Sequence, residues 1–146
     1  MSDFRKLSDD MLASPQLTAD DIEAARAEGV TLIINNRPDG EDSAQPQGAE
    51  IEAAARAAGM DYVAIPVTSA GFSQPQVAAM AEALEQAKGK VLAYCRSGTR
   101  STFLWSLASA SAGKDPRDIA ACALGAGYDI SPIMPTLEAL AAQSRG

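Results

Sequence analysis

The chain of 146 residues is best interpreted from the stretch Lys90-Val91-Leu92-Ala93-Tyr94-Cys95-Arg96-Ser97-Gly98-Thr99-Arg100-Ser101. The apolar segment 90–94 predicts a short buried strand that ends just before Cys95. The small residues after the cysteine suit a tight turn, because Gly98 adopts a positive φ without steric cost. A helix is expected over about 100–112. The stretch therefore predicts a strand, a cysteine loop and a helix in direct succession.

The flanking sequence alternates between helices and short apolar strands. Further strands are expected at 30–35 and 62–65, which are runs rich in β-branched residues. Helices are expected where alanine-rich segments end at glycine or begin with a capping residue or proline. These helices cover 19–28, 49–58, 75–88, 117–124 and 132–143, and 69–74 is expected to be a loop. The alternation predicts an α/β fold, a central mainly parallel sheet flanked by helices, in one domain over residues 1–146.

The predicted position of Cys95 points to chemistry with an anion. Ligands of such sheets sit beyond the carboxyl ends of the strands, and Cys95 lies there. Successive backbone N–H groups in the loop, together with the N-terminus of the next helix, form a cradle for an anion. The same field favours a thiolate, so Cys95 is expected to be a nucleophile without help from a histidine.

The other residues of the loop are predicted to bind the anion. Two arginines flank the cradle, and the guanidinium of Arg100 is expected to close over a bound oxyanion in a bidentate manner. The candidate catalytic residues are Cys95 and Arg100. The candidate substrate-binding residues in the loop are Arg96, Ser97, Gly98, Thr99 and Ser101.

A second candidate segment is Arg37-Pro38-Asp39-Gly40-Glu41, which follows the strand at 30–35 on the same side of the sheet as Cys95. Arg37 and Asp39 are candidate substrate-binding residues, with Arg37 contacting the anionic tail of a substrate. Asp39 or Glu41 is alternatively expected to order Arg37 or Arg100 through a charged pair. A simple turn with a surface ion pair explains the same residues equally well.

Composition excludes several classes of function. The formal net charge is −7 and the pI is about 4.5, which argues against nucleic acid and against anionic membrane surfaces as partners. No apolar run reaches the roughly 18 residues of a membrane span, and the N-terminus lacks an apolar signal segment, so a cytoplasmic protein is expected. There is no histidine, which excludes Cys-His and Ser-His pairs and argues against zinc. No metal and no other cofactor is expected.

The two cysteines do not form a disulfide framework. Cys122 lies in an apolar helical segment at 119–124, and it is predicted to be buried as a small hydrophobic residue. The alternative is a redox role as a resolving partner of Cys95.

The motifs also resemble a known family. Tyr94 to Ser101 is similar to the active loops of rhodanese sulfurtransferases and cysteine-dependent phosphatases. Together with Gln16-Leu17-Thr18, with 33–41 and with Ile65-Pro66-Val67, it resembles the bacterial beta-lactamase-hydrolase-like, phosphatase-like domains. The resemblance implies a fold like that of dual-specificity phosphatases. It also implies sulfur transfer, because members of the family are often described as sulfur transferases, and some are fused to a persulfide dioxygenase.

Three departures from the phosphatase pattern separate the alternatives that the resemblance offers. Phosphatases place five residues between cysteine and arginine, whereas four lie between Cys95 and Arg100, as in rhodaneses. Phosphatases also use an upstream aspartate as general acid, and the corresponding segment 66–72 holds no carboxylate. Asp39 or Glu41 is an alternative general acid from another loop, which requires a different geometry. Tyr94 replaces the histidine that commonly precedes the phosphatase cysteine.

The leading hypothesis is a rhodanese-like sulfurtransferase. Cys95 takes a sulfur from thiosulfate or a small persulfide and passes it to a thiol acceptor, with a persulfide dioxygenase as one possible partner. The alternative is a tyrosine- or dual-specificity-like phosphatase that forms a phosphocysteine intermediate. A non-catalytic thiol or anion sensor is the third hypothesis. The expected ligand is a small anionic sulfur or phosphate compound.

Overall fold

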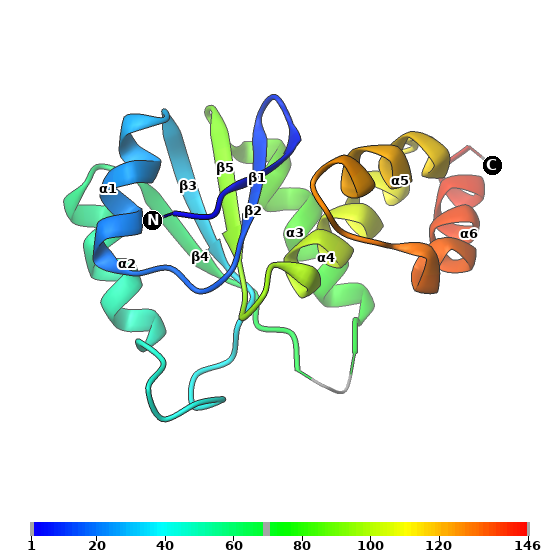
Figure 1. The fold of residues 1–146 in the computed structure, drawn as a ribbon. Helices are drawn as coiled ribbons and strands as arrows, with labels where there is room; N and C mark the ends of the chain where they lie inside the picture. Colours follow the sequence, from blue (N-terminus) through cyan, green and yellow to red (C-terminus); the bar gives the residue numbers. More distant parts are fainter. Residues whose placement is uncertain (1, 69–70, 146) are drawn as a thin grey trace.

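A five-stranded sheet forms the centre of the computed structural model, which describes residues 2–68 and 71–145 (Figure 1). The strand order is β1-β2-β5-β3-β4. The first two strands are antiparallel, and every other pair of neighbours is parallel. This arrangement confirms the predicted mainly parallel sheet. The strands are β1 (Arg5–Ser8), β2 (Met11–Ser14), β3 (Val30–Asn35), β4 (Asp61–Ala64) and β5 (Lys90–Tyr94).

Helices cover both faces of the sheet. Figure 1 shows α1 and α2 on one face and α3 and α4 on the other, with α5 and α6 beyond α4. Among residues 2–68 and 71–145, no helix is both long and apolar enough to cross a membrane. The helices are α1 (Ala19–Ala27), α2 (Gly48–Ala57), α3 (Gln74–Gln86), α4 (Thr99–Ser111), α5 (Pro116–Gly125) and α6 (Met134–Arg145), with a 3-10 turn at Ser131–Ile133.

These bounds agree with the expected helices within two residues at each end. The first helix begins with a capping box of Thr18 and Asp21, in which each side chain accepts a hydrogen bond from the other residue's backbone N–H. Of the loop expected at 69–74, residues 69–70 lie outside the described residues.

The central strand β5 divides the core into two clusters. Val91 and Ala93 belong to the cluster beneath α3 and α4, whereas Leu92 and Tyr94 belong to the cluster beneath α1 and α2. This alternation follows from the two-residue period of a strand. Because β5 is buried on both faces and paired on both edges, it holds the residue that follows it, Cys95, in a fixed place.

The N-terminal hairpin was not expected from the sequence. Its strands have only four residues each, and Asp9 and Asp10 connect them. The outer strand carries Arg5 and Lys6 because it is an edge strand, so its pattern lacks the apolar run of a buried strand. The inner strand β2 pairs with β5, so it is one of the two direct neighbours of the strand that ends just before Cys95.

The prediction that Cys122 is buried is wrong. Cys122 is exposed, on the outer side of α5. The buried positions of this helix are Pro116, Ile119 and Ala123, which are spaced three and four residues apart. Cys122 falls beside this stripe, and the alanines of the segment gave no sign of which face packs.

Candidate active site

The carboxyl ends of three parallel strands meet at one edge of the sheet. Ser14, Asn35 and Tyr94 are in register across β2, β3 and β5. The pairing continues beyond the strands, because the N–H of Cys95 donates to the Ser14 carbonyl at 3.3 Å and that of Asn36 to the Tyr94 carbonyl at 2.8 Å. Cys95 is therefore held by backbone hydrogen bonds, and segments distant in sequence are brought to its sides.

The cysteine loop wraps around the sulfur. Gly98 has φ 92° and caps α4, and its N–H donates to Sγ of Cys95 at 3.0 Å. The hydroxyl of Thr102 donates to the carbonyl of Gly98 at 2.8 Å, which fixes the first turn of the helix. The sulfur thus lies at the base of the loop, near a helix N-terminus that supplies positive potential. Cys95 is fully buried.

Arg100 is held beside the sulfur by two partners. Its Nη1 donates to the Val67 carbonyl at 2.7 Å. Its two terminal nitrogens donate to the two oxygens of Glu41 at 2.7 and 2.8 Å, in a bidentate pair. The Glu41 carboxylate raises the pKa of Arg100 most, and the Cys95 sulfur raises it further. The guanidinium is therefore both oriented and close enough to interact with the sulfur.

Glu41 joins Arg100 to Arg37. Nε of Arg37 donates to Oε1 of Glu41 at 2.9 Å, and its Nη1 donates to Oε1 of Gln16 at the same distance. The hydrogen bond from Arg100 is the main cause, and that from Arg37 a further one, of the lowering of the Glu41 pKa to about 2. Glu41 is therefore a carboxylate at neutral pH. In this arrangement it holds no proton to donate as a general acid.

The remaining candidate residues occupy different surroundings. The side chain of Arg37 is only 4% exposed, so it binds Glu41 from the buried side of that carboxylate. The carboxylate of Asp39 accepts a hydrogen bond from the N–H of Gly48 at 2.7 Å, which places it at the start of α2 rather than in the loop. The side chain of Arg96 is exposed, and it makes no hydrogen bond or ion pair within the described part of the chain.

The hydroxyl residues of the loop differ from one another. Ser97 and Thr99 are exposed, and their hydroxyls bond each other at 3.0 Å. Ser101 is fully buried, and its Oγ has no hydrogen-bond partner among the described residues. The segment 66–72 approaches the loop through Val67, whose carbonyl binds Arg100, and it contains no carboxylate.

Tyr94 does not take the place of a catalytic histidine. Its side chain packs in the cluster beneath α1 and α2, on the opposite face of β5 from α4. Burial raises the pKa of this phenol, and the nearby Tyr62 adds to the shift. Tyr94 is therefore a neutral core residue.

Sequence reasoning missed two residues that touch the site. Gln16 follows β2 and binds Arg37, and its N–H donates to the Arg96 carbonyl at 3.3 Å. Tyr128 follows α5, and its hydroxyl donates to the Ser97 carbonyl at 3.1 Å. The resemblance included Gln16 without giving it a role. Nothing in the sequence connects Tyr128 to a loop 31 residues away.

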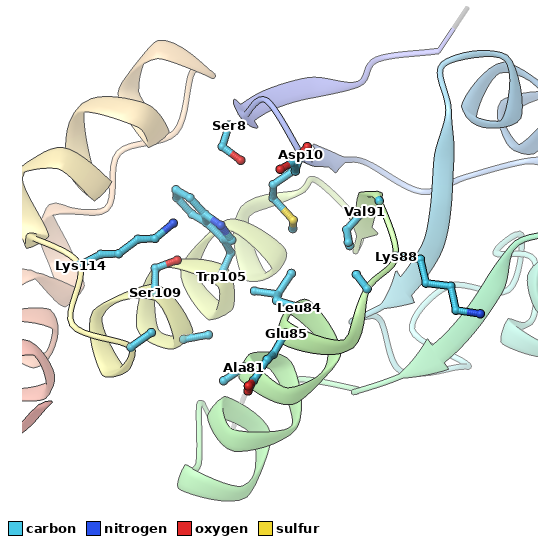
Figure 2. Close-up of a pocket in the computed structure, with 15 residues that line it drawn as sticks. Ser8, Asp10, Ala81, Leu84, Glu85, Lys88, Val91, Trp105, Ser109 and Lys114 are labelled. Carbon is cyan, nitrogen blue, oxygen red and sulfur yellow. The ribbon is translucent and has the colours of Figure 1, made fainter.

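A groove of about 800 Å³ lies at the other end of the sheet (Figure 2). Its walls include Trp105 of α4 and the pair Met11 and Val91, which are in register near the amino ends of β2 and β5. Leu84 and Lys114 also line it, from α3 and from the turn after α4. Cys95 follows the opposite end of β5, so this groove is separate from the cysteine loop.

The fold and the loop define the class of the protein. A central parallel strand leads into a cysteine loop, which leads into a helix N-terminus with an arginine in its first turn. This is the arrangement of cysteine-phosphatase-like domains. Residues 3–112 match the family described as "Beta-lactamase hydrolase-like protein, phosphatase-like domain", and the chain belongs to this family.

Curated relatives carry the same family name. The chain is 37% identical over 119 residues to a beta-lactamase hydrolase-like protein of Agrobacterium fabrum C58, covering 81% of this chain and 28% of that protein. It is 32% identical over 139 residues to one of Xylella fastidiosa 9a5c, covering 94% and 32%. The chain thus spans about a third of the length of these relatives.

Solved structures confirm the fold. A candidate phosphatase of Neisseria meningitidis Z2491, nma1982, superposes with a TM-score of 0.84 at 33% identity, covering 96% of this chain and 99% of that one. PTPMT1, solved with PI(5)P, superposes with a TM-score of 0.74 at 15% identity, covering 97% and 96%. The second likeness concerns the fold alone.

Proposed function

We propose that the chain is a sulfurtransferase that carries a sulfane sulfur on Cys95. The observation that carries this proposal is the state of Glu41, which two arginines hold as a carboxylate. It is the only acidic side chain of the described residues that pairs with Arg100. Within the described residues, the site then has a nucleophile and an anion cradle, and the carboxylate that pairs with Arg100 carries no proton to donate. Such a site suits a reaction whose leaving group departs without a proton.

Sulfur transfer from thiosulfate is such a reaction. The Cys95 thiolate attacks the outer sulfur, and the S–S bond of thiosulfate breaks with its electron pair leaving on sulfite. The product is a persulfide on Cys95. In the second half-reaction, the thiolate of an acceptor attacks the outer sulfur of this persulfide, and the Cys95 thiolate leaves. This is covalent catalysis in two steps, and neither step requires a general acid.

Two arginines have distinct roles in this proposal. Arg100, oriented by Glu41, binds the negative charge next to the sulfur. Arg96 is exposed beside the loop and contacts the outer part of the anionic donor. The proposed acceptor is a thiol compound, and a persulfide dioxygenase is a proposed partner.

Phosphate-ester hydrolysis is the second candidate, and the names of the relatives favour it. The family is described as phosphatase-like, and a structural relative at 33% identity is a candidate phosphatase. In this reaction Cys95 attacks phosphorus, the ester oxygen leaves, and water then attacks the phosphocysteine. Without a general acid, only esters with good leaving groups, such as aryl phosphates, are expected to react.

Intact-mass measurement separates these candidates. Purified protein is incubated with thiosulfate and weighed, with the Cys95→Ser and Cys122→Ser variants in parallel. We expect a gain of one sulfur atom in the wild type and in Cys122→Ser, and none in Cys95→Ser. Turnover of an aryl phosphate that needs Cys95, without any persulfide, would replace the sulfurtransferase proposal by the phosphatase. A Cys95–Cys122 disulfide under mild oxidation, with neither reaction, favours a thiol sensor.

A further inference from the structure

The peptide unit between Ser97 and Gly98 is held at both ends. Its N–H donates to Sγ of Cys95 at 3.0 Å, and its carbonyl accepts a hydrogen bond from the Tyr128 hydroxyl at 3.1 Å. In a trans peptide these two groups point in opposite directions. The hydroxyl of Tyr128 therefore sets the direction in which the N–H of Gly98 points.

The loop alone does not fix this peptide. Gly98 has φ 92°, and glycine occupies positive and negative φ with similar ease. A rotation of the peptide would turn the Ser97 carbonyl toward the sulfur and the N–H away from it. The carbonyl dipole would then repel a thiolate and an anionic substrate. A partner on the far side of the peptide is needed to prevent this rotation.

Tyr128 is suited to this task. It is 7% exposed, and a Cβ at position 98 would overlap its hydroxyl, so the ring packs directly on the loop. Burial raises the pKa of Tyr128, so the phenol keeps its proton and donates. The Arg5 guanidinium lies 5.4 Å from the ring centroid and donates to the Ala126 carbonyl at 3.3 Å. The N-terminal strand thus holds the tyrosine in place.

We infer that Tyr128 is a positioning residue for the nucleophile. It keeps the Ser97–Gly98 peptide with its N–H toward the sulfur of Cys95, and in this way it maintains the reactive form of the loop. Tyr128 lies beyond residues 3–112, the part of the chain that matches the family. The inference rests on the proposed role of Cys95 as a nucleophile, but it does not depend on whether sulfur or phosphate is transferred.

The test compares Tyr128→Phe with Thr31→Val, both in a Cys122→Ser background so that Cys95 is the only thiol. Both changes remove a hydroxyl that donates to a backbone carbonyl, but Thr31 donates to Lys90 at the other end of the sheet. The readout is the rate at which iodoacetamide alkylates Cys95 from pH 5 to 9. We expect Tyr128→Phe to slow alkylation at neutral pH about fivefold, the effect of one lost hydrogen bond, and to shift the profile to higher pH. Thr31→Val is expected to retain the profile of the background protein.

A second measurement reports the Ser97–Gly98 peptide itself, and it is needed if Tyr128→Phe also lowers the stability of the fold. In NMR spectra, the chemical shift of the Gly98 amide should change when Cys95 is replaced by serine. This change should disappear in the Tyr128→Phe background. An unchanged alkylation profile together with an unchanged Gly98 response would overturn the inference.

If the proposed function is wrong, the turnover and alkylation measurements give a different combination of results. If Cys95 neither accepts sulfur nor hydrolyses a phosphate ester, its alkylation still reports the environment of the sulfur. A wild-type protein without turnover, combined with a shifted alkylation profile in Tyr128→Phe, would reject the proposed reaction and retain the role of Tyr128.

Discussion

The two oxygens of Glu41 accept hydrogen bonds from the two terminal nitrogens of Arg100 at 2.7 and 2.8 Å. The residues are 59 positions apart in the chain, and the carboxyl ends of β3 and β5 bring them together. Arg37 supports the same carboxylate from its buried side. The position of the guanidinium beside Cys95 therefore depends on a residue outside the cysteine loop.

Glu41→Gln is expected to impair the reaction. An amide offers one oxygen and carries no charge, so the bidentate pair with Arg100 is lost and the guanidinium is free to turn away. We expect kcat/KM for thiosulfate to fall about 10- to 100-fold, as misplacement of a charge-stabilising group does. The control is Glu23→Gln, which removes a carboxylate from an exposed ion pair with Arg26. A Glu41→Gln enzyme with wild-type kcat/KM would show that this orientation is unimportant.

Glu41 is also expected to make stability depend on acid pH. The folded protein lowers its pKa from the ordinary value of 4.5 to about 2, so its contribution is complete above about pH 4.5 and disappears as pH falls toward 2. Its hydrogen bonds to partly buried charged groups indicate a contribution of about 1–2 kcal/mol. Denaturant unfolding of wild type and Glu41→Gln should differ by this amount at pH 6. The difference should shrink steadily below pH 4.5, and a difference that stays constant to pH 2 would contradict the assignment.

Gly98→Ala is expected to abolish the reaction. The φ of 92° strains any residue with a Cβ, and the added methyl overlaps the Tyr128 hydroxyl. Relief of both requires the loop to move, at a cost of about 1–3 kcal/mol. The matched control is Gly29→Ala, which has a similar φ of 89° but open space around the Cβ. We expect both variants to lose stability in thermal unfolding, and only Gly98→Ala to lose persulfide formation as seen by mass.

The sequence predicts the sheet and the loop because local patterns encode them. The β-branched run at 30–35 and the apolar run at 90–94 identify the parallel strands, and the glycines mark the helix ends. The cysteine, the glycine and the arginine of the loop lie within six residues, so their proximity follows from the chain itself. The placement of this loop at the carboxyl end of the sheet then follows from the rules of parallel sheets.

Contacts between distant segments were harder to predict. The sequence offered Asp39 and Glu41 as partners of either arginine, and only the structure shows that Glu41 pairs with both while Asp39 binds Gly48. The N-terminal hairpin stays hidden because its outer strand is short and polar. Tyr128 carries no local signal, since its partner is a backbone carbonyl that any residue provides.

Arg96→Ala and Asp39→Asn should separate substrate binding from support of the fold. Arg96 is exposed with no side-chain partner in the described residues, so its loss removes attraction for an anionic donor and leaves the loop intact. We expect KM for thiosulfate to rise about 3- to 10-fold with kcat nearly unchanged, and the effect should weaken at high salt because exposed charges are screened.

Asp39→Asn weakens the acceptor for the Gly48 N–H at the start of α2, so it should lower the free energy of unfolding by about 1 kcal/mol and leave KM unchanged. A KM effect confined to Asp39→Asn would contradict the role proposed for Arg96 and support the expectation that Asp39 binds the substrate. Steady-state kinetics at two ionic strengths, with urea unfolding of the same preparations, distinguishes these outcomes.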